Sequence, residues 1–248
     1  FMSEFFADLL TIQFAYAVGI VFLGGLLHGY TGWGGGLVMM PLLTLIYSPV
    51  EALMIAAIGG LLLMARMYPQ AIRTANWLEM RPLYLVMLVA TPLGGLLLLI
   101  LDPGLVRKVI GGIIVAASLL IVSGWQYRGT CGVAAASIFG CISGVVNGFA
   151  GVGGPFFVIY IIAHPDEPSV QRANIIIAAG LQILLIVVTL AATGAVSWDV
   201  FLLGLILAPA QFLSGLIGVR IFALAPQEMY KKFTLIAIVI LGASVVIF

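Results

Sequence analysis

Two glycine-rich stretches hold the residues of this chain that are best suited to bind a ligand. One begins at Gly29 and the other at Gly148, 119 positions later, and both follow a Gly-x-x-Gly-x-Gly-Gly frame. Glycine lets a ligand approach the backbone closely, and a helix that begins after such a stretch presents free N–H groups and the positive end of its dipole. These stretches therefore favour the binding of a small anion; the alternative is that the glycines only let helices pack closely.

Polar side chains flank both frames. His28 and Asn147 occupy equivalent positions, one residue before the first glycine, and each can donate a hydrogen bond to an anion. Histidine titrates near neutral pH, so His28 is also a candidate carrier of a coupled proton. The alternative is a neutral histidine bonded to a backbone carbonyl that is freed where the glycine frame interrupts the helix. We expect the anion to contact both side chains and these frame residues: Gly32, Trp33, Gly34, Gly35, Gly36, Gly151, Gly153, Gly154 and Pro155.

Three further polar residues lie in the apolar segments of the second half. Arg172 lies in the first turns of its segment, where its guanidinium can pair with a sulfonate or extend to the lipid headgroups. Asn174 shares a helix face with Gln171 and Gln182, and Gln211 is a similar case. Such polar residues face the protein interior, either along a substrate path or as hydrogen-bonded contacts between helices. We include Arg172, Asn174 and Gln211 in the predicted site.

The elements that position these residues are transmembrane helices. The chain has 248 residues, of which 63% are hydrophobic and 8% charged, and its mean hydropathy is +1.27. A soluble domain carries about 25% charged residues, so this chain has too little charge to cover a water-facing surface. The composition predicts an all-α polytopic membrane protein surrounded by a lipid bilayer. A formal charge of +1 does not indicate nucleic acid as a partner.

Two of the apolar segments are too short to cross a membrane. Segments 37–48 and 155–163 would span only about 18 and 14 Å as helices, and each directly follows a glycine frame. Each half is therefore predicted to be a broken, re-entrant helical hairpin followed by three transmembrane helices. Residues 67–80 are predicted to be a loop that could form a short interfacial helix. The eight longer segments are 11–30, 50–66, 81–101, 104–125, 132–150, 169–192, 198–222 and 228–248.

The topology depends on how the hairpins cross the membrane. If the two arms of each hairpin enter and leave on the same side of the membrane, the two halves are inverted repeats. If each hairpin crosses the membrane once, the two halves are parallel repeats. Cytoplasmic loops are enriched in Lys and Arg, which favours inverted repeats, 1–125 and 131–248, in a single integral membrane domain with both termini outside. That arrangement places Arg66, Arg73, Arg81, Arg128, Arg172, Arg220, Lys231 and Lys232 inside, and only Arg107 and Lys108 outside.

Paired discontinuous helices are typical of the substrate site of a secondary transporter that works by alternating access. An anion channel of the same fold and, less favoured, a membrane-embedded enzyme are the alternatives. An enzyme or redox protein would need acid–base pairs or a set of metal or haem ligands. His28 and His164 are far apart in sequence, and no Asp or Glu lies deep in a span. We therefore expect no enzymatic activity, no metal site and no cofactor.

The two frames resemble the sulfite exporter TauE/SafE family of bacterial and archaeal membrane transporters. The resemblance covers nearly the whole chain and rests on the glycines of 32–36 followed by Pro41, and on the second-half element 151–155. Pro155 replaces the first copy's Gly36, and Tyr160 replaces Pro41, so the halves need not bind symmetrically.

The resemblance implies a substrate class and a location. It implies a transporter, expected to be an exporter, of small sulfur-containing anions such as sulfite, thiosulfate or organosulfonates. It also implies a multi-pass protein of the prokaryotic cell (inner) membrane. The coupling ion is left open between a proton and sodium.

Overall fold

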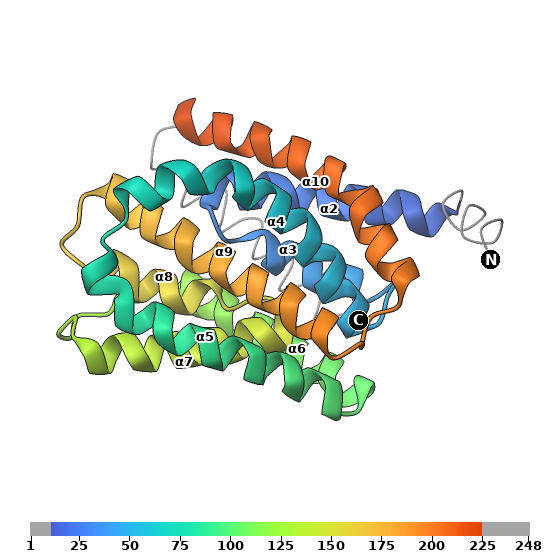
Figure 1. The fold of residues 1–248 in the computed structure, drawn as a ribbon, viewed down its shortest axis with the longest axis horizontal. Helices are drawn as coiled ribbons and strands as arrows, with labels where there is room; N and C mark the ends of the chain where they lie inside the picture. The colour runs from blue at the N-terminus through green and yellow to red at the C-terminus, as the bar shows by residue number, and fades with distance from the viewer. Residues whose placement is uncertain (1–10, 225–248) are drawn as a thin grey trace.

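The structure is a computed structural model in which residues 11–224 are described, and every element in that range is an α-helix (Figure 1). Residues 1–10 and 225–248 lie outside the described residues, and with them the predicted span 228–248, Lys231 and Lys232. The helices are α2 (Ile12–Thr31), α3 (Gly35–Leu43), α4 (Pro49–Thr74), α5 (Trp77–Ile100), α6 (Pro103–Val122), α7 (Val133–Ala150), α8 (Gly154–Ala163), α9 (Pro168–Ala192) and α10 (Trp198–Leu224).

Most of these helices can cross a membrane. Seven helices within residues 11–224 are long and apolar enough to do so, which confirms the predicted all-α polytopic membrane fold. α3 and α8 have only 9 and 10 residues. At 1.5 Å per residue they extend about 14 and 15 Å, roughly half of a membrane core of about 30 Å. The predicted half-length helices after the two glycine frames are thus present.

A glycine in a left-handed conformation ends the helix before each break. Gly32 has φ 87° and ends α2, and Gly151 has φ 70° and ends α7. Their amides donate to the carbonyl oxygens of His28 and Asn147, which closes each helix end. A side chain at a positive φ strains the backbone, so these two positions require glycine. The next helix begins three residues later in both halves.

The same helix pairing occurs twice in the bundle. Figure 1 shows α5 and α7 on one side, α2 and α10 on the other, and α4 and α9 between them. Gly148 of α7 lies against the carbonyl of Thr91 in α5, and Gly29 of α2 lies against the carbonyl of Gly215 in α10. Neither glycine has room for a side chain. Because Gly29 and Gly148 are counterparts in the two frames, equivalent residues make equivalent contacts.

The core of the described chain is formed by α3, α4, α8 and α9. Residues 52–60 of α4 and 173–180 of α9 are buried along their whole length. Met39, Met40 and Phe157 from the two short helices are at most 2% exposed. In such an apolar interior a polar group is stable only if it has a hydrogen-bond partner, so each polar group near the breaks has to be accounted for.

The predicted connection over residues 67–80, a loop or a short interfacial helix, was wrong. α4 continues to Thr74, passing through Pro69, and α5 already begins at Trp77. Membrane helices tolerate proline when neighbouring groups satisfy the freed backbone carbonyl, so Pro69 does not end α4. The turn is set instead by Asn76, whose side chain accepts a hydrogen bond from the Glu79 amide and caps α5.

The helix termini gather at two opposite ends of the molecule. At the α4–α5 end, the α4–α5 and α8–α9 turns touch, because Asn76 Nδ2 donates to Asp166 Oδ1 at 3.1 Å. At the α3–α6 end, Thr44 after α3 lies near Arg107 of α6. α4 runs from one end to the other. Among the described cations, Arg66, Arg73, Arg81, Arg128, Arg172 and Arg220 lie towards the α4–α5 end, and Arg107 and Lys108 at the α3–α6 end.

Candidate functional site

The two glycine breaks meet inside the bundle. Gly36 at the start of α3 lies against the carbonyl of Gly151, and Gly154 at the start of α8 lies against the indole ring of Trp33. α4 and α9 cover this meeting point, and between the breaks is a cavity of about 40 Å³, which we call the central cavity. Its polar lining consists of His28, Trp33, Asn147 and Gln182, and its apolar walls include Met39, Met40, Leu53, Phe157, Ile183 and Ile186.

The size and charge of the central cavity restrict what it can hold. About 40 Å³ accommodates a few water molecules or one small ion, whereas drug-sized ligands need about 300 Å³ or more. Among the described residues, no Asp, Glu, Lys or Arg lines the cavity. An ion bound here must therefore be held by hydrogen bonds and helix dipoles rather than by a paired side-chain charge.

The Thr31 side chain stabilises the loop of the first break. Its Oγ1 accepts hydrogen bonds from the amides of Trp33 at 3.1 Å and Gly34 at 2.7 Å, and donates to the carbonyl of Leu27 at 2.8 Å. One hydroxyl thus satisfies the loop amides that lead into α3. His28, one turn earlier on α2, has no hydrogen bond to this loop. Its imidazole can therefore bind a ligand in the cavity.

Asn147 does the equivalent work in the second break. Its Oδ1 accepts a hydrogen bond from the amide of Gly153, the counterpart of Gly34, at 3.0 Å. Ser143 Oγ donates to the carbonyl of Gly153 at 2.9 Å, and Gln182 Nε2 donates to Ser143 Oγ at 2.9 Å. Because its oxygen already accepts one hydrogen bond, Asn147 offers the cavity chiefly its two amide N–H groups.

Two buried polar atoms in the cavity wall lack a hydrogen-bond partner among the described residues. They are His28 Nε2 and Trp33 Nε1. A buried polar group without a partner costs about 1–3 kcal/mol, and the two residues that carry these groups line the same small cavity. An indole N–H can only donate, so the group that binds beside Trp33 must be a hydrogen-bond acceptor. This geometry favours an anion over a cation.

The two short helices add backbone donors. The amides of Gly35 and Gly36 in α3, and of Gly154 in α8, donate no hydrogen bond within residues 11–224, as is normal in the first turn of a helix. Gly36 and Gly154 line the cavity. Pro155 has no N–H to offer, so α3 contributes more donors than α8. This difference follows from the sequence departure at Pro155.

The predicted site residues divide into three groups by position. The residues that line the central cavity are His28, Trp33, Gly36, Asn147, Gly151 and Gly154. Those that shape the two breaks next to it are Gly32, Gly34, Gly35, Gly153 and Pro155. Those that lie outside it are Arg172, Asn174 and Gln211.

Arg172 is bound to the C-terminal end of α2. Its guanidinium donates to the carbonyls of Tyr30 at 3.2 Å and Gly29 at 3.3 Å, and stacks on the ring of Phe222 with 3.7 Å to the ring centre. The last carbonyls of a helix lack intrahelical partners and carry the negative end of the dipole, so a cation there is favourable. Arg172 lines a separate pocket at the α4–α5 end.

Asn174 and Gln211 make contacts between helices. Asn174 Oδ1 accepts a hydrogen bond from the amide of Asn76 at 2.9 Å, at the start of α5. Gln211 Nε2 donates to the carbonyl of Ala56 at 3.2 Å, which ties α10 to α4. Of the polar residues considered on α9 and α10, Gln182 is the one that lines the central cavity.

Sequence reasoning missed the residues that brace the two breaks. Thr31 lies three residues before Gly34, the spacing at which a Thr hydroxyl bonds a backbone amide at a helix boundary, so it could have been found. Ser143 carried a weaker signal, as a small polar residue in an apolar segment. The apolar walls carried none, because a residue such as Met40 has the same sequence pattern whether it packs in a core or faces a cavity.

Comparison with known proteins places the chain in a family. The family model described as sulfite exporter TauE/SafE matches residues 17–245. No match was found among the curated proteins or the solved structures. Because the family model covers most of the chain, this multi-pass membrane protein belongs to the sulfite exporter TauE/SafE family, a family of membrane transporters for sulfite and related sulfur anions rather than of enzymes.

Proposed function

We propose that this protein is a secondary transporter that exports small sulfur oxyanions or sulfonates across the prokaryotic inner membrane by alternating access, with the central cavity as its substrate site. The observation that carries the proposal is that His28 and Trp33 line one cavity where two half-length helices begin, and that each has a buried side-chain nitrogen without a partner among the described residues. A pyramidal oxyanion such as sulfite offers acceptors in several directions, which suits donors that converge from both breaks.

Neutral donors suffice to bind the anion in this setting. Away from water, hydrogen bonds to an ionised acceptor are roughly twice as strong as neutral ones. The contributing donors are the side chains of His28, Trp33 and Asn147 and the first amides of α3 and α8. The size of the cavity favours sulfite over organosulfonates; a larger sulfonate requires movement of the flexible walls at Met39 and Met40.

Alternating access would require the two halves to be inverted repeats that move against each other. Equivalent turns at opposite ends of the bundle support this arrangement. The α3–α4 turn lies at the α3–α6 end, whereas its counterpart, the α8–α9 turn, lies at the α4–α5 end through the Asn76–Asp166 contact. The repeated pairing of α2 with α10 and of α7 with α5 supports it as well.

Flux of radiolabelled sulfite in proteoliposomes tests the transport proposal. We expect saturable uptake that thiosulfate inhibits and that follows an imposed proton or sodium gradient, according to the coupling ion. Steady single-channel currents would instead favour the channel alternative. If no sulfur anion moves or binds, the substrate proposal is wrong.

Binding can be followed separately from flux. Trp77, Trp125 and Trp198 are at least 46% exposed, whereas Trp33 alone among the tryptophans lines the central cavity. In a Trp77→Phe, Trp125→Phe, Trp198→Phe protein, sulfite bound to the Trp33 indole N–H should change its fluorescence. Absence of any change at millimolar sulfite would contradict the proposed site.

A further inference from the structure

Two basic pockets flank the central cavity, one at each end of the molecule. The three-arginine pocket lies at the α4–α5 end, has a volume of about 510 Å³ and is lined by Arg66 of α4, Arg172 of α9 and Arg220 of α10. The Arg107 pocket lies at the α3–α6 end, between α3 and α6, and has a volume of about 410 Å³. The proposed substrate site lies between them.

The three-arginine pocket concentrates positive charge. It draws one guanidinium from each of three helices, together with the polar side chains of Gln70, Thr74 and Ser169. No Asp or Glu lines it in the part of the chain that the structure describes, and Arg66 and Arg220 form no ion pair with a described residue. The positive charges of all three arginines attract an anion in this pocket.

This pocket lies one helical turn from the central cavity. On α9, Ile176 lines the pocket and Ala179 lines the cavity, three residues or about 4.5 Å further along the helix. On α2, the carbonyls of Gly29 and Tyr30, which Arg172 holds, directly follow His28. Arg172 therefore stands where the pocket adjoins the cavity.

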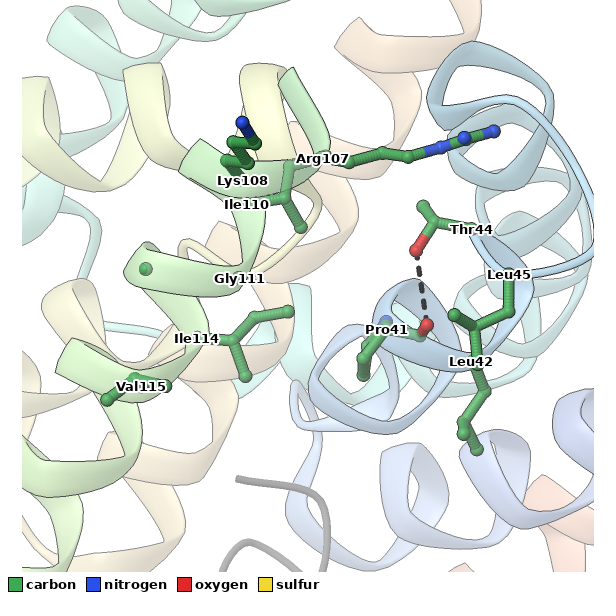
Figure 2. Close-up of a pocket in the computed structure, with 11 residues that line it drawn as sticks. Pro41, Leu42, Thr44, Leu45, Arg107, Lys108, Ile110, Gly111, Ile114 and Val115 are labelled. Carbon is green, nitrogen blue, oxygen red and sulfur yellow. Dashed lines mark hydrogen bonds between the residues drawn. The ribbon is translucent and has the colours of Figure 1, made fainter. Parts of the chain in front are cut away.

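The Arg107 pocket adjoins the cavity from the other side. Met40 lines the central cavity, and the next residue, Pro41, lines the Arg107 pocket. Figure 2 shows Arg107 extending from α6 across the opening, near Thr44 at the end of α3. The Thr44 hydroxyl donates to the carbonyls of Met40 and Pro41 and is therefore already engaged within α3. The positive charge of the pocket comes from Arg107 and Lys108 of α6.

We propose that the two pockets are anion vestibules at the ends of one path, which runs from the three-arginine pocket through the central cavity to the Arg107 pocket. The nature of the anion, a small sulfur oxyanion, rests on the proposed function; the affinity of the pockets for an oxyanion does not. Each vestibule concentrates the anion at the mouth of an uncharged cavity. Arg66 and Arg220 bind it at one mouth and Arg107 at the other, while Arg172 holds the end of α2 against α9.

The rate of anion entry tests the path. In the protein with Trp33 as its only tryptophan, the association rate of sulfite is measured by stopped-flow fluorescence at low salt. The variants are Arg66→Gln with Arg220→Gln, and Arg107→Gln with Lys108→Gln. Electrostatic steering raises association rates tenfold or more, so removal of either vestibule should slow association about threefold and weaken its dependence on salt.

A matched control separates a local site from general charge. Arg73→Gln with Arg81→Gln removes the same charge at the same end, but neither residue lines either pocket. We expect this variant to slow association by less than twofold. If it slows entry as much as the Arg66 and Arg220 variant does, general surface charge accounts for the effect and the vestibule is wrong.

A direct binding measurement works even if the protein does not transport sulfite. Sulfate should raise the unfolding temperature of the wild-type protein in detergent, and raise it less in the Arg66→Gln, Arg220→Gln variant than in the control. Equal stabilisation in both variants would overturn the three-arginine site. If anionic phospholipid removes the sulfate effect in the wild-type protein, a lipid phosphate occupies the pocket and the vestibule proposal also fails.

Discussion

At the scale of single residues, the two breaks are stabilised by different side chains. Thr31 holds the amides of the first break, whereas Asn147 holds the equivalent amide of the second. His28 and Asn147 are counterparts in sequence, yet only Asn147 accepts a hydrogen bond from a loop amide. Because Thr31 already accepts hydrogen bonds from the loop amides, the Nε2 atom of His28 has no partner in the loop.

Thr31→Ala should destabilise the protein, because it leaves the amides of Trp33 and Gly34 buried without an acceptor. An unsatisfied buried group costs about 1–3 kcal/mol. Unfolding in detergent, followed by circular dichroism against temperature, measures the loss. Thr31→Ser keeps the hydroxyl and should restore most of the stability; a Thr31→Ala protein as stable as the wild type would show that the loop does not depend on this side chain.

Trp33→Phe should weaken anion binding without lowering the stability of the protein. It removes a buried N–H that has no partner among the described residues, so stability should stay the same or rise by about 1 kcal/mol. If the N–H binds the anion, the KM for sulfite flux should rise about tenfold or more, since a hydrogen bond to a charged group contributes about 1.5–3 kcal/mol.

The control for Trp33 is Trp198→Phe. Trp198 is 67% exposed and stacks on Phe201 at the start of α10, away from the cavity. It should leave the KM unchanged. An unchanged KM in Trp33→Phe as well would remove the indole from the binding site.

At the scale of elements, the breaks and the short helices were predictable because glycine frames interrupt otherwise continuous apolar sequence. The helix boundaries were less predictable. α3 begins at Gly35 rather than near Leu37, and the end of α4 was misplaced because Arg66 and Pro69 look like a boundary in sequence. The turn there depends on the Asn76 cap and its contact with Asp166, which is distant in sequence.

Alanine at the two left-handed glycines tests the helix ends. Gly32→Ala should cost about 1–2 kcal/mol from its positive φ alone, because a Cβ there meets only ordinary contacts at 3.5 Å. Gly151→Ala should cost more, since its Cβ would also lie 2.9 Å from the side chains of Leu53 and Met40. Thermal unfolding in detergent would rank the variants.

Gly19→Ala is the matched control for these helix ends. Gly19 lies inside α2 with no atom within 4 Å of a Cβ, so alanine should stabilise the helix slightly. If all three variants unfold at the same temperature, the left-handed glycines do not set the helix ends.

At the scale of the whole molecule, the order of the spans was predictable from sequence, and the walls of the cavity were not. Hydropathy and length located the described membrane helices to within a few residues, apart from the 67–80 region. Which apolar side chains face the cavity depends on how α3, α4, α8 and α9 cross. Periodicity within one helix shows that Met40 or Leu53 is buried, but not which element covers it.

The inverted arrangement predicts which turns face each side of the membrane. The α4–α5 end carries six of the described arginines, so the positive-inside rule places it in the cytoplasm. The connector around Gln126 and the turn at Glu167 should then be cytoplasmic, and the turn at Ala195 external. A parallel arrangement would instead place Gln126 and Glu167 on opposite sides, because the second hairpin would then cross the membrane once.

Cysteine labelling of intact cells distinguishes these arrangements. In a background with Cys131→Ser and Cys141→Ser, Ala195→Cys should react with a membrane-impermeant thiol reagent, whereas Gln126→Cys and Glu167→Cys should react only after permeabilisation. All three positions are exposed in turns or connectors, so the reagent can reach them. Opposite labelling of Gln126→Cys and Glu167→Cys would exclude inverted halves. Reaction of that pair, but not of Ala195→Cys, would keep the inversion and reverse the orientation, which would place the three-arginine pocket outside the cell.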